Sequence, residues 1–318
     1  MDNLIGNTPL IKIKYKYNKE IKEIYTKLEY YNLTGSIKDR MAYFIISNGY
    51  ESGKLKKGMP IIEATSGNTG IAFSAIGAHY SNPVYIFMPD WVSSERKSIM
   101  EMFGAHVTLV SKEQGGFTKC IELADELSKK INGFRPNQFD NLDNIDAHYL
   151  TTGKEIVEKM DNINGFVSGI GTGGTLMGIS KRLKETNPNM ITCALEPDDM
   201  PLLSSGKIFG SHKIDGIGDD FIPSIVDQNK IDTVITVNDD DAINMSRMLG
   251  KQLGLGVGIS SGANLLGAIL LNDKIGGNIV TVFPDCNKKY LSTDLSKEID
   301  LSKDFISNKI ELISYEVI

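Results

Sequence analysis

Cysteine and histidine are scarce in this chain of 318 residues, and neither type is clustered. The three cysteines, Cys120, Cys193 and Cys286, are odd in number and have no paired spacing, which argues against a disulfide framework and against a zinc site. The four histidines are scattered along the chain as well. We therefore expect no metal centre.

Long hydrophobic runs are also missing. The longest, around residues 265–271, is too short to span a bilayer. The N-terminus has no positively charged region followed by an apolar stretch, so it lacks the pattern of a secretory signal. These absences predict a cytoplasmic protein with no membrane partner.

An excess of basic residues is absent too. The chain has 40 acidic and 34 basic residues, and its net charge is −6. Since no dense basic run is present, we expect no nucleic-acid partner. A small-molecule ligand is the better expectation.

Apolar residues make up 41% of the sequence, enough for a large core that we expect to divide between two domains. Strand-like runs alternate with helix-period segments, a pattern typical of parallel sheets with crossover helices. The Asn-rich stretch at 137–144 separates two such series. We predict an α/β fold with domains at 1–145 and 146–318. The expected strands are 60–64, 83–88, 107–110, 166–170, 191–196 and 278–283, and the expected helices start near residues 71 and 94 and cover 147–160, 175–184 and 241–253.

A glycine-rich loop at 169–175 follows one expected strand and opens a helix. Its backbone amides and the helix dipole form an anion site that suits a phosphate. Thr172 and Thr175 add hydroxyl donors that suit a terminal phosphate monoester. The same loop also satisfies the dinucleotide pattern GxGxxG, and Glu196 ends the next strand where a ribose-binding acid would lie. A dinucleotide site is therefore an open alternative.

Two further loops have similar composition. The stretch TSGNTG at 65–70 offers amides and hydroxyls that suit a carboxylate, and GISSGAN at 258–264 resembles it. Each is equally consistent with a helix cap or a turn. Lys38, within GSIKDR at 35–40, is either a solvated lysine or an amine made nucleophilic by burial.

Together these ordered motifs resemble the cysteine synthase and cystathionine β-synthase family, enzymes of fold type II that use pyridoxal 5′-phosphate. The resemblance covers nearly the whole chain and implies a cofactor in the cleft between two α/β domains, each a mainly parallel twisted sheet flanked by helices. It also implies a homodimer and an amino-acid substrate of the cysteine, serine or O-acetylserine class. The matching stretches are 5–10, 34–40, 63–70, 137–139, 169–175, 216–218, 221–223, 258–263, 283–285 and 290–293.

The resemblance also implies roles for individual residues. Lys38 would form the Schiff base and remove the α-proton, Asn68 would bind the cofactor's ring oxygen, and Ser260 would bind the pyridine nitrogen. The phosphate would be held by Gly171, Thr172, Gly173, Gly174 and Thr175. The substrate would be held by Thr65, Ser66, Gly67, Thr69, Gln138 and Gly218.

Ser260 has a chemical consequence. A neutral hydroxyl holds the pyridine nitrogen protonated less firmly than an aspartate does, so the ring is a weaker electron sink. Such a site suits elimination at the β-carbon, giving an α-aminoacrylate to which a nucleophile then adds. The overall reaction is expected to be a β-replacement.

One loop departs from the usual cysteine synthase pattern. Where those enzymes resemble GIGAGF, this chain has GIGDDF at 216–221. Asp220 matches an acid of the cystathionine β-synthase pattern GIGxDF, and Asp219 falls on its variable position. Either both acids face solvent, or one faces the aminoacrylate and acts as general base to water.

These acids favour the conversion of L-cysteine and water to L-serine and hydrogen sulfide, the reaction of a hydrogen sulfide-producing lyase. Cysteine synthase acting on O-acetylserine and sulfide, and condensation of serine with a thiol as in cystathionine β-synthase, are the alternatives within the family. A non-catalytic homologue that binds an amino acid or a partner is the alternative from another class.

Overall fold

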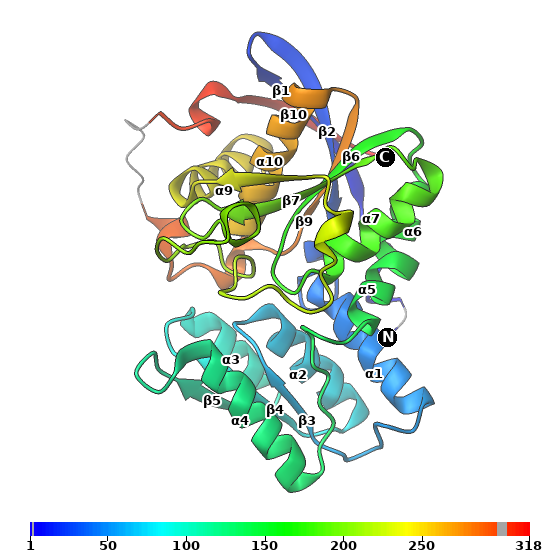
Figure 1. Ribbon diagram of the computed structural model, residues 1–318, viewed down its shortest axis with the longest axis vertical. Coiled ribbons are helices and arrows are strands. Elements are labelled where there is room, and N and C mark those ends of the chain that lie inside the picture. Colours follow the sequence, from blue (N-terminus) through cyan, green and yellow to red (C-terminus); the bar gives the residue numbers. More distant parts are fainter. Residues whose placement is uncertain (2, 298–303) are drawn as a thin grey trace.

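The computed structural model describes residues 1, 3–297 and 304–318, which form two β-sheets packed with helices (Figure 1). The larger sheet has the strand order β10-β1-β2-β9-β6-β7-β8, and the smaller has the order β3-β4-β5. The pairs of β2 with β9, of β9 with β6, of β6 with β7 and of β7 with β8 are parallel, as is the whole smaller sheet. The predicted α/β class with mainly parallel sheets is confirmed.

The strands of the larger sheet are β1 (Leu10–Tyr17), β2 (Glu20–Leu28), β6 (Ile163–Gly169), β7 (Ile191–Pro197), β8 (Thr233–Val237), β9 (Asn278–Phe283) and β10 (Glu311–Val317). Those of the smaller sheet are β3 (Ile61–Ala64), β4 (Val84–Pro89) and β5 (His106–Val110). The helices are α1 (Lys38–Glu51), α2 (Asn68–Tyr80), α3 (Ser94–Met102), α4 (Gly116–Ile131), α5 (Asp143–Ala147), α6 (Lys154–Val157), α7 (Gly174–Thr186), α8 (Leu202–Ser205), α9 (Asp239–Leu253) and α10 (Ile259–Ile275). Among the described residues, none of these helices has the length and apolar character needed to cross a bilayer.

The expected strands and helices appear with shifts of a few residues at their ends. The expected helix at 147–160 is instead a chain of three pieces, because a π-helical turn, His148–Gly153, lies between α5 and α6. The strands β1, β2, β8 and β10 and the helices α1, α4 and α10 were not among the expected elements.

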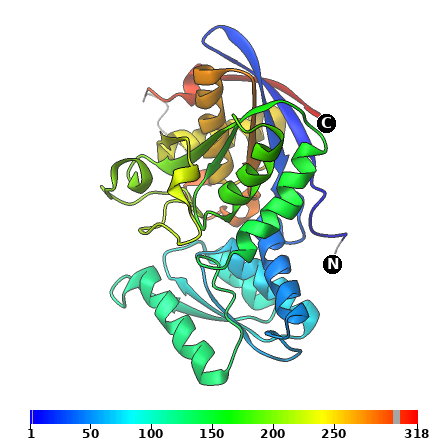
Figure 2. The ribbon, with the colours of Figure 1, turned by 45° about the vertical axis from the view of Figure 1, so that its right-hand side comes forward.

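The antiparallel hairpin of β1 and β2 brings the N-terminus into the larger sheet. Isoleucine and tyrosine alternate with lysine along β1, which suits a strand with one buried face. Asn18 and Lys19 both have positive φ, 49° and 68°, as a two-residue type I′ turn requires. In both views the blue hairpin and the red C-terminal strand lie together in the upper part (Figure 1, Figure 2). Residues 10–28 thus join the sheet formed by the second half of the chain.

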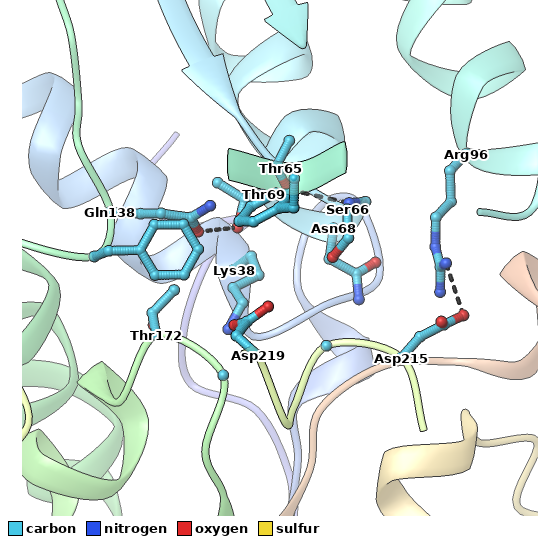
Figure 3. Close-up of a pocket in the computed structure, with 15 residues that line it drawn as sticks. Lys38, Thr65, Ser66, Asn68, Thr69, Arg96, Gln138, Thr172, Asp215 and Asp219 are labelled. Carbon is cyan, nitrogen blue, oxygen red and sulfur yellow. Dashed lines mark hydrogen bonds and ion pairs between the residues drawn. The ribbon is translucent and has the colours of Figure 1, made fainter. Parts of the chain in front are cut away.

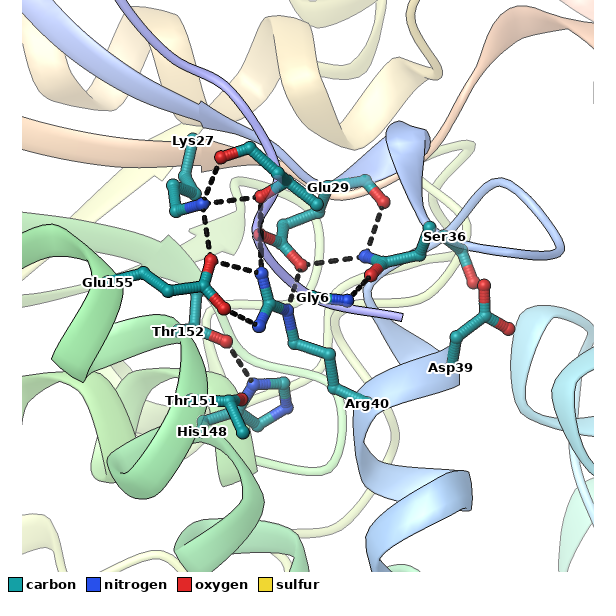
Figure 4. A network of polar contacts seen from close by, with 12 residues as sticks. Gly6, Lys27, Glu29, Ser36, Asp39, Arg40, His148, Thr151, Thr152 and Glu155 are labelled. Atoms are coloured by element: carbon teal, nitrogen blue, oxygen red, sulfur yellow. Dashed lines mark hydrogen bonds and ion pairs between the residues drawn. The ribbon is translucent and has the colours of Figure 1, made fainter. Parts of the chain in front are cut away.

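A buried network of charged residues joins this hairpin to α1 and α6 (Figure 4). Arg40 forms two-pronged ion pairs with Glu29, at 2.6 and 2.9 Å, and with Glu155, at 2.6 and 2.8 Å. Lys27 donates to Glu155 at 2.6 Å. Burial opposes ionisation of Glu29, but the charge and hydrogen bonds of Arg40, together with the charge of Lys27 and the Thr8 hydroxyl, outweigh it and lower the pKa of that carboxyl to about 2. Lys38 lies two residues before Arg40, so the network anchors the helix that carries it.

Replacing Glu29 with glutamine should test this anchor. Removing one partner leaves Arg40 buried and half-paired, which should lower the free energy of unfolding by about 3–5 kcal/mol at neutral pH. Because the pKa of Glu29 is depressed, the difference from wild type should persist above the ordinary carboxyl pKa and vanish as the pH falls towards 2. Urea unfolding at several pH values measures both effects. Glu158→Gln is the control, because its pair with Lys154 is exposed; equal stability of the two variants would contradict the anchoring role.

Candidate active site

Two adjoining cavities, of about 460 and 490 Å³, share Lys38, Asn68, Gly171, Thr172 and Gly216 in their walls. The first extends to the loop at 65–69 and the second to the loop at 169–175. The two loops that follow β3 and β6 therefore meet at one cleft.

Lys38 is the first residue of α1, and its side chain lies in the middle of the cleft beside Asp219 (Figure 3). Burial lowers the pKa of its amine, while the charges of Asp219 and Asp285 oppose that shift. A lowered pKa makes part of the amine neutral and able to act as a nucleophile or base. The environment is therefore that of a reactive lysine, and the alternative of a solvated one is wrong.

Five of the six predicted substrate residues gather in the first cavity, and the sixth, Gly218, lines a smaller one. The walls of the first cavity include Thr65, Ser66, Gly67, Thr69 and Gln138. Thr69 donates to the side-chain oxygen of Gln138 at 2.7 Å, and the Gln138 amide donates to the Ala64 carbonyl at 3.0 Å (Figure 3). Half of the TSGNTG stretch is helical, since α2 begins at Asn68. The loop is thus both a helix start and a wall of the cleft.

The glycines at 169–175 leave room for a ligand against the backbone. Gly173 has a φ of 88° and lies at the N-terminus of α7, where amides and the helix dipole attract an anion. A Cβ at Gly171 would lie 2.2 Å from the Gly216 carbonyl oxygen, and one at Gly174 would lie 2.0 Å from Asn144 Oδ1. Thr172 and Thr175 line the second cavity. These features suit a phosphate monoester.

The loop GISSGAN at 258–264 is the start of a helix rather than a strand-to-helix turn. Gly258 is the N-cap of α10, and the following residues form its first turn. Ser260, nearly buried, lines the second cavity together with Lys38 and the phosphate loop. Its hydroxyl is thus placed at the far side of the cleft from the substrate loop.

The structure separates the two neighbouring acids. Asp219 lines the first cavity, whereas Asp220 is exposed and is absent from the described walls of both cavities. Burial and the charge of Asp220 raise the pKa of Asp219 to about 6, against the charges of His212 and Lys38, which act to lower it. Gly218 and Asp219 also line a smaller, mainly apolar cavity of about 320 Å³. Of the two acids, only Asp219 reaches the cleft.

Glu196 does not have the role that a dinucleotide site would need. Its carboxylate accepts hydrogen bonds from the Leu203 and Ser204 amides, at 2.8 and 3.0 Å, and from the Ser204 hydroxyl. Both oxygens are therefore already used in holding α8. Among the described residues, no group of three or more His, Cys, Asp or Glu is placed to hold a metal ion.

Sequence reasoning missed Arg96, Asp215 and Asn144. Arg96 is buried, lies over the Tyr290 ring and pairs with Asp215 at 2.8 Å across the cleft (Figure 3). Asn144 donates to the Gln138 carbonyl and to the Thr172 hydroxyl, both at 2.9 Å. It thus joins the substrate side to the phosphate loop. The Asn-rich stretch at 137–144, which contains Asn144, predicted only a domain boundary.

The residues of the cleft fit pyridoxal phosphate. The glycine cradle at the α7 N-terminus suits the phosphate, Lys38 has a lowered pKa at the junction of the cavities, and Ser260 offers a neutral hydroxyl. The hydroxyls at 65–69 suit the carboxylate of an amino acid.

Comparison with known proteins agrees with this geometry. The family model described as "Pyridoxal-phosphate dependent enzyme" matches residues 1–285. The chain is 42% identical over 298 residues to cysteine synthase B of Campylobacter jejuni, covering 93% of this chain and 97% of that protein. It superimposes on a hydrogen sulfide-producing enzyme from Fusobacterium nucleatum with a TM-score of 0.96 and 51% identity, covering 100% and 98% of the two chains.

A second solved structure is an aspartate-to-asparagine mutant of a hydrogen sulfide-producing enzyme with the α-aminoacrylate intermediate. It has a TM-score of 0.96 and 52% identity, covering 98% of this chain and 96% of the other. The chain belongs to the family of pyridoxal-phosphate dependent enzymes. Within that family it is a member of the cysteine synthase group, whose chemistry is β-replacement on an amino acid.

Gly174→Val should weaken cofactor binding. The new side chain would displace Asn144 from Thr172 and crowd the phosphate cradle, and overpacking of this kind typically costs about 1–3 kcal/mol. The dissociation constant for pyridoxal phosphate, measured by titration of the apoenzyme, should rise by about tenfold to a hundredfold. Gly250→Ala in α9 is the control, because its nearest contact would be an ordinary 3.8 Å. Normal cofactor affinity in the valine variant would argue against this phosphate site.

Proposed function

We propose that this enzyme converts L-cysteine and water to L-serine and hydrogen sulfide. The observation that carries the proposal is Asp219, a carboxyl group beside Lys38 where the usual pattern has a small neutral residue. The resemblance to the hydrogen sulfide-producing enzyme of Fusobacterium nucleatum supports the same reaction.

Pyridoxal phosphate, when bound, supplies the electron sink that stabilises negative charge at the substrate α-carbon. The chain's own residues then have three tasks. Hydroxyls and amides at 65–69, with Gln138, hold the substrate carboxylate. Lys38 takes the proton from the α-carbon, because its lowered pKa makes the neutral amine available. The remaining task is to activate the group that replaces sulfide.

Asp219 is proposed for that task. At neutral pH a carboxyl with a pKa of about 6 is mostly ionised, yet basic enough to accept a proton from water. Its negative charge also disfavours approach of the hydrosulfide anion, the nucleophile of cysteine synthesis. After sulfide has left as hydrosulfide, the oxygen of water bonds to the β-carbon, the proton that water loses passes to Asp219, and Lys38 returns its proton to the α-carbon.

Cysteine synthase remains the second candidate, because the relative from Campylobacter jejuni carries that name. The two functions are separated by incubating the enzyme with L-cysteine alone and with O-acetylserine plus sulfide. Serine and sulfide from the first mixture support the proposal. Efficient cysteine formation from the second, with no serine from the first, would overturn it.

We also propose that the chain acts as a homodimer, on the family resemblance, and that its domains divide near residue 145. That division falls within α5. Light scattering coupled to gel filtration should give about twice the chain mass of 35.0 kDa. A monomer mass would contradict the first of these proposals.

Asp219→Asn tests the general base. Amide replaces carboxylate with almost the same shape, so sulfide release in the first turnover should survive through Lys38. Serine formation should slow by about a hundredfold to ten-thousandfold, the usual contribution of a general base. Sulfide and serine are followed together after mixing with L-cysteine. Asp220→Asn, one residue away and exposed, is the matched control and should leave both rates near wild type; a large loss there and none at Asp219 would reverse the assignment.

The pH dependence offers an independent test. Because burial raises the pKa of Asp219 to about 6, its basic form is lost as the pH falls through that value. The rate of serine formation should therefore rise between pH 5 and 7 with a midpoint of about 6, and then level off. The Asp219→Asn variant should lack this step. A step that persists unchanged in the variant would assign the titration to another group.

A further inference from the structure

Lys289 is a buried cation that the reaction described above does not use. Only 2% of its surface is exposed, and it lies four residues beyond the end of the loop at 283–285 that matches the family. Its ammonium donates to Asn68 Oδ1 at 2.8 Å and to the Gly35 carbonyl at 3.1 Å. The ion pairs found among the described residues do not include it. Its two hydrogen bonds go to neutral oxygens, and its charge also opposes the burial that raises the pKa of Asp39.

These contacts determine the orientation of the Asn68 amide. An ammonium has only donors and a carboxylate only acceptors, so the oxygen of the amide must face Lys289 and its nitrogen must face Asp285. The Asn68 nitrogen does donate to Asp285 Oδ2, at 2.7 Å. The Tyr290 hydroxyl donates to the same oxygen at 2.7 Å and holds the carboxylate in place. A flipped amide would place oxygen against carboxylate and NH₂ against ammonium.

The same ammonium also reaches the segment that carries Lys38. Gly35 lies three residues before Lys38, and the Ile37 amide donates to the Pro284 carbonyl at 2.8 Å. Lys38 and Asn68 are two of the predicted cofactor-contacting groups that line both cavities. They come from different helices, α1 and α2, and Lys289 contacts the surroundings of both.

We propose that Lys289 is a positioning residue, which fixes the Asn68 amide and the Lys38 segment relative to each other for pyridoxal phosphate. Its ammonium polarises the amide through Oδ1, and this makes the Asn68 nitrogen a stronger donor towards the cofactor's ring oxygen. Without that charge the amide is held only through its bond to Asp285, and the two cofactor contacts are no longer held together.

Lys289→Met tests this role, since it keeps the apolar stem and removes the charge. The dissociation constant for pyridoxal phosphate should rise about tenfold to a hundredfold, the usual range for losing a hydrogen bond to a charged group. The visible absorption band of the bound cofactor should shift, because it reports the hydrogen bonding of the ring oxygen. Lys289→Arg should restore much of both properties. Lys288→Met is the matched control, because that neighbour is exposed, and it should resemble wild type.

A second comparison separates positioning from simple stability. In an Asn68→Ala background, Lys289→Met should cause little further change in the spectrum, since the amide through which it acts is gone. If Lys289→Met does not fold, Lys289→Gln takes its place with the same readouts. Wild-type affinity and spectrum, with only an equal drop in the melting temperatures of the apo and loaded forms, would overturn the proposal and leave Lys289 a purely structural residue.

Discussion

The pairing of Arg40 with two carboxylates is the interaction on which the placement of the active-site lysine depends. Glu155 lies 115 residues from Arg40 in the sequence, whereas Glu29 lies 11 residues from it, and all three are largely buried. Burial of charge is costly unless the geometry is excellent, and here each pair is two-pronged. Their cost is offset only when the N-terminal hairpin, α1 and α6 are all in place. Lys38 is the first residue of α1 and lies two residues before Arg40. Correct assembly of the larger sheet therefore also places the amine of Lys38.

The parallel sheets explain why the remaining groups converge. Loops at the carboxyl ends of parallel strands meet at one edge of a sheet, and ligands bind there. The loop after β3 provides the hydroxyls at 65–69, and the loop after β6 provides the phosphate cradle. Asn144 bonds to both sides, so the two half-sites are held at a set separation. His148 is buried beside Thr175. Burial and the charges of Lys38 and Arg40 lower the pKa of His148 to about 3, so its ring stays neutral and adds no charge to the phosphate site.

Much of this arrangement was predictable because its signals are local. A glycine-rich loop between a strand pattern and a helix pattern can be recognised from a few consecutive residues. The order of these loops along the chain matches that of the family motifs. The alternation of isoleucine, tyrosine and lysine in β1 was an available signal for the missed hairpin, as was the turn at Asn18. Three pairs of buried or partly buried residues were not predictable, because each joins residues far apart in the chain. They are Arg40 with Glu155, Arg96 with Asp215, and Lys289 with Asn68. Nothing in the sequence distinguishes such a buried charge from a solvated one.

The neighbouring acids show most clearly what folding adds to composition. Asp219 and Asp220 are chemically identical, and successive side chains in an extended loop point in different directions, so sequence alone does not rank them. The backbone around Gly216 and Gly218, both with positive φ, turns one acid into the cleft and leaves the other in solvent. Desolvation then raises the basicity of the inward acid. In the proposed reaction, the loop conformation, more than the number of carboxylates, would decide which nucleophile the site favours, because a partly desolvated negative charge beside Lys38 would accept a proton from water and repel an anion.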